Sequence, residues 1–344
     1  MENTIDVMEN IPETKVVLPS QESNPMQLLP FTKEELCEQI KWQSHPANPL
    51  INPSLVPDFN YLADPTWMPP DQTPDGLFHL IAPAGINLCQ FTSKDGIQWK
   101  RDRSPVMKGA VRPYLYKEGD VYHLFYTKVH MVVLFTDKLS STIQMTSSKD
   151  LIHWGKPKTI QTPTVPLQKE AVGNPCVVKA GNKYLLYSSG GTALLTDCYF
   201  TEPHSIWVAE ADSIDGPYEL ISGPIIDLTS EDPDMNIGAG SIKVLRTKDG
   251  YFIGFVNGIH KNERGGSTSA IKILWSVDGY EWEGFDSAHI VKPDPAKGEL
   301  FAYACDVHVY DGKLYLYYNT RDGKLRGTER ISLAIGNLPK KQQD

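Results

Sequence analysis

The side chains best suited to chemistry stand near the starts of short, strand-like segments that recur along the chain. Three of them are carboxylic acids: Asp64 in ADPTWMP, Glu170 just ahead of GNPCVVK, and Asp306 in ACDVHVY. A carboxyl group can donate or accept a proton, or attack an electrophilic carbon. The sequence therefore indicates acid–base or nucleophilic chemistry, provided that the fold brings these segment starts together.

The segment that holds Asp306 carries a second polar group two residues later, at His308. In a strand, these two residues share one face while Val307 and Val309 share the other. Polar groups on an otherwise apolar strand are costly unless they meet water or a ligand. We therefore expect Asp306 to be a site residue. His308 could hold a substrate hydroxyl or a metal ion, and a buried, hydrogen-bonded histidine is the alternative.

Arg112, in VRPYLYK, stands at the equivalent place in another segment. Its guanidinium would lower the pKa of neighbouring carboxyl groups and could bind an anionic ligand through paired hydrogen bonds. A salt bridge between neighbouring units is the alternative. Trp67, three residues after Asp64, could form the floor of a binding site, and packing in the core fits its position equally well.

A repeated phrase, a polar turn followed by an alternating aromatic and aliphatic strand, must position these residues. Its five copies read PDGLFHLIAP, EGDVYHLFYT, AGNKYLLYSS, KDGYFIGFVN and YDGKLYLYYN, at 74–83, 118–127, 180–189, 248–257 and 310–319. Each copy lies between one of the short segments and a third strand, and alternation at period two is typical of half-buried strands. Such repetition predicts an all-β fold, a five-bladed β-propeller whose segment starts converge on the axis.

The propeller is expected to occupy residues 45–344, preceded by an N-terminal arm and short helix over residues 1–44. Thr32 and Glu35 have the spacing of a capping box, which predicts a helix over about 32–42. The N-terminal region is therefore expected to lie outside the repeated units.

Three tryptophans, Trp99, Trp154 and Trp282, follow Asp turns in the third strands and are expected to pack between blades. The longest insertions, around 189–205 and 222–236, are expected to decorate one face and shape a pocket.

The five ordered units, the phrase NPLINP ahead of ADPTW, and the Ser-x-Asp-x-x-x-Trp turns resemble the five-bladed propeller glycoside hydrolases. The resemblance covers roughly residues 45–338 and is nearest to family 43, in the clan of arabinanases, xylosidases, invertases and levansucrases. It implies an Asp on the first blade as general base or nucleophile. It also implies an Asp on the second blade that tunes the acid, and a Glu on the third blade as general acid.

Asp64, followed by proline, matches the first of these positions. On the second blade Arg112 stands where the resemblance implies an Asp. On the third blade Asn174 precedes Pro175, and the nearest carboxylate, Glu170, lies five residues before that proline rather than two. Either Glu170 or Asp306 is thus expected to be the acid. The residues expected to bind substrate are Trp67, Arg112, Asn174 and His308.

Two carboxyl groups on either side of a glycosidic bond can cleave it, because one protonates the leaving oxygen while the other activates water or attacks the anomeric carbon. The resemblance implies a glycoside hydrolase-like protein that cleaves such a bond in an oligo- or polysaccharide, with Asp64 as base or nucleophile. A glycoside phosphorylase or transglycosidase, and a non-catalytic carbohydrate-binding propeller, are the alternatives. No cofactor is expected to be required and no catalytic metal is expected. A structural calcium ion at the axis is compatible with the resemblance.

The composition of the chain argues against some classes of binding partner. A net charge of −9 without a run of Lys and Arg argues against nucleic acid. No apolar stretch approaches about 18 residues, and the acidic N-terminus lacks the basic and apolar regions of a signal peptide. A cytoplasmic protein without membrane contact is therefore expected.

Its five cysteines, with no CxxC pair, are expected to be reduced and mostly buried rather than zinc ligands. The sequence sets no oligomeric state.

Overall fold

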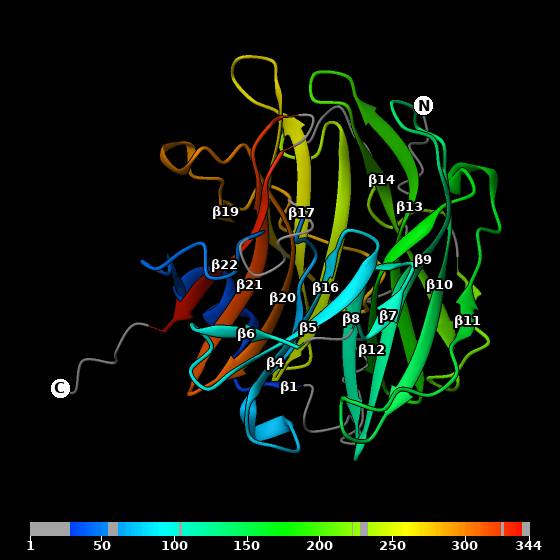
Figure 1. The fold of residues 1–344 in the computed structure, drawn as a ribbon, viewed down its shortest axis with the longest axis vertical. Helices are drawn as coiled ribbons and strands as arrows, with labels where there is room; N and C mark the ends of the chain where they lie inside the picture. The colour runs from blue at the N-terminus through cyan, green and yellow to red at the C-terminus, as the bar shows by residue number, and fades with distance from the viewer. Residues whose placement is uncertain are drawn as a thin grey trace, which may run out of the picture.

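The computed structural model describes residues 28–53, 61–102, 105–221, 223–227, 233–324 and 327–338. Apart from a few short helical turns, these residues form β-strands and their connections, so the all-β prediction is confirmed (Figure 1). Most of the expected N-terminal arm, residues 1–27, lies outside the described residues. Within the ranges given above, no helix is both long and apolar enough to cross a membrane.

The described strands pair in chain order as antiparallel units, which we number from first to fifth. The first unit contains β3 (Thr66–Met68), β4 (Phe78–Ala84), β5 (Asn87–Ser93) and β6 (Trp99–Arg101), with β7 (Met107–Lys108) also paired to β5. The second contains β8 (Ala110–Glu118), β9 (Val121–Val132), β10 (Leu139–Ser148) and β11 (Lys158–Gln161). The third contains β12 (Val172–Ala180), β13 (Lys183–Leu195), β14 (Phe200–Ala211) and β15 (Glu219–Leu220).

The last two units form one larger sheet. The fourth contains β16 (Gly238–Thr247), β17 (Phe252–Lys261), β18 (Ser267–Ser276) and β19 (His289–Val291). The fifth contains β20 (Phe301–Tyr310), β21 (Lys313–Arg321), β22 (Glu329–Asn337) and, from the N-terminal region, β2 (Lys41–Ser44). One parallel bridge, from Ser269 to Phe301, joins the two units. A two-residue strand, β1 (Leu28–Leu29), lies parallel to β16.

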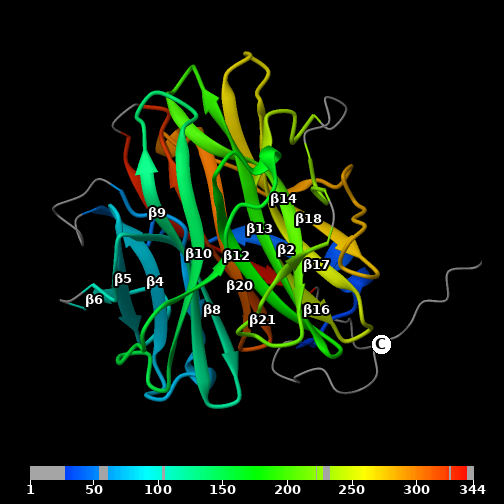
Figure 2. The same cartoon turned by 90° about the vertical axis from the view of Figure 1, so that its right-hand side faces the viewer.

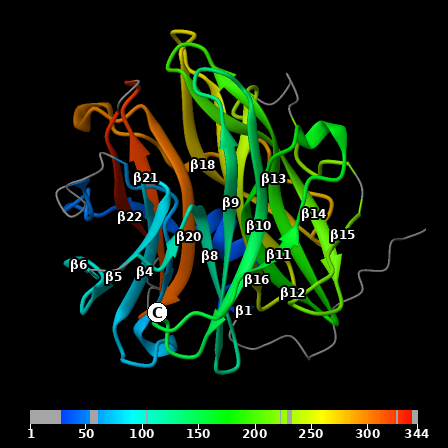
Figure 3. The same cartoon turned by 45° about the vertical axis from the view of Figure 1, so that its right-hand side comes forward.

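The aromatic phrase forms the second strand of every unit, as the repeat predicts: β4, β9, β13, β17 and β21. Figures 2 and 3 show the units standing side by side around the molecule. Their first strands contact one another in order, β3 with β8, β8 with β12, β12 with β16 and β16 with β20. Strand β20 in turn contacts β3, so the fifth unit packs against the first.

The N-terminal helix is shorter than predicted. Its capping box is present: the Thr32 N–H donates to Glu35 Oε2 at 2.8 Å, and the Glu35 N–H donates to Thr32 Oγ1 at 3.1 Å. The helix covers residues 33–39, with Glu35–Gln39 wound as a π-helix. The prediction of a helix to residue 42 is wrong because Lys41–Ser44 pairs with β22 and extends the fifth unit instead.

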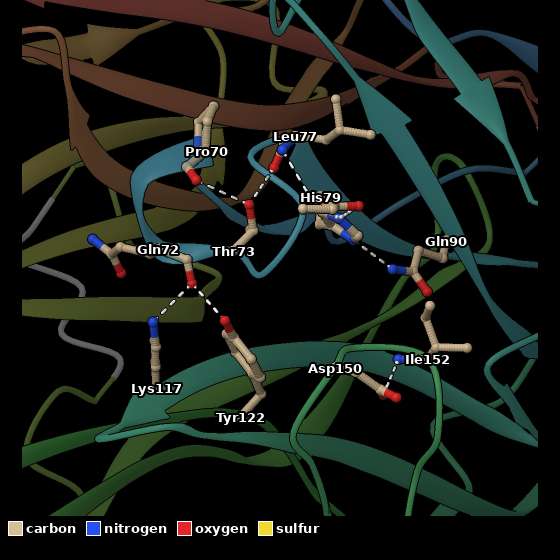
Figure 4. Close-up of polar contacts among 11 residues, drawn as sticks. Pro70, Gln72, Thr73, Leu77, His79, Gln90, Lys117, Tyr122, Asp150 and Ile152 are labelled. Atoms are coloured by element: carbon tan, nitrogen blue, oxygen red, sulfur yellow. Dashed lines mark hydrogen bonds and ion pairs between the residues drawn. The ribbon is translucent and has the colours of Figure 1, made fainter.

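Short 3₁₀-helices lie in the connections between described strands, at Pro70–Gln72, Pro166–Gln168 and Pro295–Lys297. The first of them ties the first unit to the second, as Figure 4 shows. The carbonyl oxygen of Gln72 accepts hydrogen bonds from Lys117 Nζ at 2.9 Å and from the Tyr122 hydroxyl at 2.7 Å. These contacts fix neighbouring units at the end of the strands opposite to the long β13–β14 hairpin (Figure 1).

Aromatic side chains of the repeated phrase hydrogen-bond to Asp-Gly turns of neighbouring units. The Tyr187 hydroxyl, in the third unit, donates to the Gly279 carbonyl of the fourth at 2.9 Å. The Tyr317 hydroxyl, in the fifth unit, donates to the Gly96 carbonyl of the first at 2.7 Å. The same contact therefore recurs between the third and fourth units and between the fifth and first.

The tryptophans that follow the turns pack as predicted. Trp282 meets the ring of Tyr187 at 6.0 Å and Trp99 meets that of Tyr317 at 5.6 Å, each across two units. Trp154 packs on a cluster that joins the first and second units. None of the five cysteines is paired in a disulfide, and all but Cys37 are buried, as expected.

Gly96 offers a direct test of this packing. Its φ is +72°, and a Cβ there would lie 2.8 Å from the Tyr317 hydroxyl oxygen. Gly96→Ala is expected to lower the free energy of unfolding by about 2–4 kcal/mol, because left-handed strain adds to a steric clash. Gly76→Ala is the matched control: its φ is +69° but nothing lies within 4 Å, so about 1 kcal/mol is expected. Urea unfolding of both variants measures the difference, and equal losses would contradict the proposed contact.

Candidate active site

Three residues in the left-handed region, each followed by proline, stand at equivalent places, one just ahead of β3 and the others within β8 and β12. These residues are Asp64 (φ 40°), Arg112 (φ 53°) and Asn174 (φ 49°). The β8–β9 and β12–β13 ladders shift register at this point. A left-handed conformation costs a non-glycine residue about 1–2 kcal/mol. Such strain at equivalent positions points to a functional reason for these side chains.

Polar residues of the second strands support the interruptions. Asn319 Oδ1, in β21, accepts a hydrogen bond from the Asp64 N–H at 3.2 Å. Thr127 Oγ1, in β9, accepts one from the Asn174 N–H at 3.2 Å. In each pair the two residues belong to consecutive units, the fifth and first or the second and third. The interrupted strands are therefore held by their neighbours rather than by their own ladders.

These interruptions face a cavity of about 480 Å³. Its walls come from the first strands and from the β9–β10 and β13–β14 hairpins, whose ends lie at the top of Figure 1. The charged groups among its lining residues are Asp64, Arg112, Glu202, Arg321 and Glu329, and its aromatic ones are Tyr61, Phe135, Tyr199, Phe200 and Tyr303. Carboxyl groups, cations and aromatic rings thus share one concave site.

Asp64 contributes the first carboxyl group. It lies at the entry to β3 and is partly buried. Burial raises its pKa, and the positive charges of Arg112 and Lys243 offset part of that increase. The two cations act toward the ionised form, which a base or nucleophile requires.

Glu202 contributes a second carboxyl group, from β14 of the third unit. Burial raises its pKa to about 7, against the opposing charge of Arg112 and with a further increase from the charge of Asp64. A carboxyl group with that pKa is partly protonated at neutral pH. Glu202 is therefore suited to donate a proton.

Glu329, at the start of β22, is the third carboxyl group and is buried. Its Oε1 contacts Arg321 Nη1 at 2.6 Å. Burial raises the pKa of Glu329, and the Arg321 charge opposes that increase. Because one oxygen is engaged by the guanidinium, Glu329 is better placed to orient Arg321 than to reach a substrate.

The sequence and the fold both resemble known proteins. Residues 102–234 match the model of the glycosyl hydrolases family 43. A putative glycoside hydrolase from Parabacteroides distasonis is similar in structure, with a TM-score of 0.62 and 17% identity over 88% of this chain and 98% of that chain. The Cellvibrio cellulosa α-L-arabinanase complexed with arabinohexaose has a TM-score of 0.57 and 16% identity, over 82% and 96% of the two chains.

A family 117 glycoside hydrolase from Zobellia galactanivorans is also similar, with a TM-score of 0.56 and 13% identity over 90% of this chain and 93% of that chain. No curated protein matches the sequence significantly. The predicted resemblance is confirmed. The chain resembles the glycosyl hydrolases family 43 over residues 102–234, and its fold is that of solved glycoside hydrolases.

Two residues expected to bind substrate line the cavity: Arg112 and Asn174. The Asn174 amide nitrogen donates to Ser189 Oγ and to the Gly240 carbonyl, both at 2.9 Å. Its side chain thus links the third unit to the fourth. The positive charge of Arg112 acts on both carboxyl groups, because it opposes the burial-driven rise in the pKa of Asp64 and of Glu202.

Glu170 is not part of the cavity. It lies exposed in a left-handed turn after the second 3₁₀-helix, with φ 63°, and it is absent from the residues that line the cavity. Its backbone carbonyl accepts a hydrogen bond from the Ser141 N–H at 3.1 Å. The turn directs Glu170 to solvent, so its expected role as general acid finds no support in its position.

Asp306 is buried between strands rather than in the cavity. Its Oδ2 accepts hydrogen bonds from Thr66 Oγ1 at 2.7 Å and from the Trp67 N–H at 2.9 Å, and its Oδ1 accepts one from the Val307 N–H at 3.0 Å. Burial alone would raise its pKa, but the neighbouring His308 imidazole, the charge of Lys243 and the hydrogen bond from Thr66 hold it below its usual value. Asp306 thus joins the fifth unit to the first, and this structural role explains the polar residue on an apolar strand.

Trp67 and His308 also lie outside the residues that line the cavity. Trp67 is fully buried, and its ring stacks on Phe78 at 6.0 Å. His308 meets the Trp67 ring edge-on at 5.1 Å and places Nε2 3.7 Å from Asp306 Oδ2. Core packing, the alternative for Trp67, describes its position better than substrate binding. His308 is half-buried outside the cavity, and its Nε2 makes no hydrogen bond with the described residues.

The surroundings of His308 do not fit a calcium ion. Calcium takes six to eight oxygen ligands, whereas the nearby carboxylate of Asp306 is engaged by Thr66 and by backbone N–H groups.

Sequence reasoning missed Glu202, Arg321 and Glu329. Glu202 had a signal: Pro203 follows it, within the insertion at 189–205 that was expected to shape a pocket. Tyr199–Pro203 does line the cavity, in agreement with that expectation. Arg321 and Glu329 stand at the ends of β21 and β22 without a recurring motif, so no pattern singled them out. Of the second insertion, 222–236, residues 222 and 228–232 lie outside the described residues.

Proposed function

We propose that the five units are the blades of a five-bladed propeller and that its cavity cleaves a glycosidic bond. The contacts that run from each first strand to the next, and from β20 back to β3, support a closed ring. So does the Tyr317–Gly96 hydrogen bond, which repeats between the last and first units the contact made by Tyr187. The similarity to solved glycoside hydrolases agrees with this architecture.

One observation carries the proposed activity: Asp64 and Glu202 reach the same cavity from the first and third units, where burial raises the pKa of Glu202 to about 7 and the charges of Arg112 and Lys243 oppose the increase at Asp64. Glycosidic cleavage needs one ionised and one protonated carboxyl group. Glu202 therefore occupies the third-blade role for which the sequence offered Glu170. Asp64 keeps the first-blade role expected from the sequence.

In the proposed reaction Glu202 donates its proton to the glycosidic oxygen as the bond to the anomeric carbon breaks. Asp64 either removes a proton from the attacking water or forms the new bond to the anomeric carbon itself. In the second case, water later releases the sugar, and Glu202 takes that water's proton. The net change is the addition of one water molecule across the glycosidic bond.

The other lining residues suit a carbohydrate. Val132, Leu134, Phe135 and Tyr199 form an apolar rim, and the rings of Phe135 and Tyr199 lie edge to face at 6.0 Å. Such a rim can cover the apolar face of a sugar ring. Below it, Arg112 and Arg321 present hydrogen-bond donors to sugar hydroxyls or to an acidic sugar. We propose an oligo- or polysaccharide substrate on this basis.

The pH dependence of turnover tests the proposal. A panel of aryl glycosides that includes arabinofuranosides and xylosides supplies the substrate, and kcat/KM is measured from pH 5 to 9. Because Glu202 must be protonated to act, kcat/KM is expected to fall as pH rises through about 7, approaching a tenfold loss per pH unit. Turnover that remains constant to pH 9 would overturn the assigned acid.

The same panel separates the alternatives. Turnover that requires inorganic phosphate would favour a phosphorylase, and sugar binding in calorimetry without any turnover would favour a binding protein.

A further inference from the structure

A cluster of metal-binding side chains lies in the fourth unit, outside the residues that line the cavity. It consists of Asp234, just ahead of β16, His260 in β17 and His289 in β19. One oxygen or nitrogen atom from each residue lies within 4.8 Å of the others, and all three side chains are partly buried. Three separate chain segments therefore bring ligand atoms to one point.

The two imidazoles have nitrogen atoms that lack hydrogen bonds. His260 Nδ1 and His289 Nε2 are buried and make none with the described residues. An imidazole nitrogen left in this way loses its hydration without compensation, and such groups call for an explanation. The two rings lie nearly parallel with centroids 5.5 Å apart. Each ring therefore has a nitrogen without a hydrogen bond, and one nitrogen of each ring lies within 4.8 Å of a carboxylate oxygen of Asp234.

Lys272 orients that carboxylate. Its side chain is fully buried, and its Nζ contacts Asp234 Oδ2 at 2.9 Å and also hydrogen-bonds to the Phe285 carbonyl. The other oxygen, Asp234 Oδ1, lies 3.3 Å from His289 Nε2. Hydrogen bonds that hold the far oxygen of a ligating carboxylate are a common feature of metal sites, because they fix its direction.

We propose that Asp234, His260 and His289 bind a divalent transition metal of the zinc class. Two imidazoles and one carboxylate suit zinc and its neighbours rather than magnesium or calcium, which prefer oxygen ligands. Two ligands at about 2.0–2.1 Å from a tetrahedral zinc ion lie about 3.3 Å apart, which is the separation of Asp234 Oδ1 and His289 Nε2. The fourth position is left for water.

The site would join the segment ahead of β16 to β17 and to the outer strand β19. A neutral imidazole from each histidine can offer a lone pair to the ion. The positive charge of the Lys272 ammonium repels a divalent metal ion and so lowers the affinity of the site for that ion. Because the three ligands lie outside the residues that line the cavity, the metal stabilises the fourth unit and takes no part in the reaction at the cavity.

Metal binding to the untagged full-length protein tests this proposal, with Zn²⁺ and Co²⁺ as the probes. Calorimetry is expected to show one Zn²⁺ per chain, and Zn²⁺ is expected to raise the melting temperature. His260→Ala and His289→Ala are expected to weaken Zn²⁺ binding by at least about 100-fold. The control is His153→Ala: His153 is exposed and its Nδ1 lies 2.7 Å from Asp150, so it has a carboxylate neighbour but no second imidazole.

Co²⁺ gives a readout that does not depend on any variant. A tetrahedral site is expected to give strong visible absorption with wild-type protein, and Zn²⁺ is expected to remove it. Circular dichroism checks that each variant is folded. The proposal is overturned if wild type binds Zn²⁺ no more tightly than the folded His260→Ala and His289→Ala variants, or if His153→Ala weakens binding as much as they do. Wild type without the Co²⁺ absorption would likewise overturn it.

Discussion

Replacing Glu202 by glutamine is expected to lower kcat/KM by about 10²–10⁴-fold on glycosides with poor leaving groups. Glutamine keeps the size of the side chain but cannot donate the proton that the departing oxygen needs. Glycosides with an activated leaving group, such as a nitrophenyl group, depart without that proton and are expected to lose much less, about tenfold. The decline above a pH of about 7, which reflects the Glu202 carboxyl group, is expected to disappear in this variant.

Glu170→Gln is the matched control, because Glu170 is also in the third-unit region but is exposed and outside the cavity. It is expected to leave kcat/KM within about twofold of wild type for every leaving group, since no contact with the substrate is lost. A larger loss for Glu170→Gln than for Glu202→Gln would reverse the assignment of the acid.

Replacing Asp64 by asparagine is expected to have the largest effect, a loss in kcat on the order of 10⁴-fold, as for other residues that act in the bond-making step. The loss is expected for activated and unactivated leaving groups alike, because the base or nucleophile is needed whichever group departs. Asparagine can still accept the backbone constraints of this left-handed position, since asparagine tolerates that conformation. Urea unfolding is therefore expected to show near wild-type stability.

Steady-state kinetics and calorimetry on Asp64→Asn provide the check. Sugar binding is expected to persist while turnover is lost, because Arg112, Arg321 and the apolar rim remain. Turnover equal to wild type in a folded Asp64→Asn protein would remove Asp64 from the mechanism.

Much of the fold could be predicted because its information is local. Alternating residues and Asp-Gly turns recur in each unit, and each copy of the phrase formed the expected strand. The predicted end of the N-terminal helix was wrong because Lys41–Ser44 forms a strand that pairs with β22, almost 300 residues later in the chain. No pattern within the N-terminal region announces such a partner.

The site was predicted only where its residues belong to the repeat. Asp64, Arg112 and Asn174 stand at equivalent interruptions, so alignment of the units found them together. Glu202 instead reaches the cavity because β13 and β14 extend beyond the repeat. The prediction that Asp306 belongs to the site failed because two situations give the same sequence pattern, a polar residue on an apolar strand. The polar side chain can be buried with all its hydrogen bonds made, or it can face a ligand.

The crystal structure of Glu202→Gln with a bound oligosaccharide tests the central claim most directly, since this variant is expected to bind substrate without rapid turnover. We predict a glycosidic oxygen within about 3.2 Å of the side chain at position 202. The Asp64 carboxylate is predicted on the opposite face of the anomeric carbon, either against it or separated from it by one water molecule. A sugar bound outside this cavity, or a glycosidic oxygen that faces Glu329 instead of position 202, would contradict the roles assigned to the two residues.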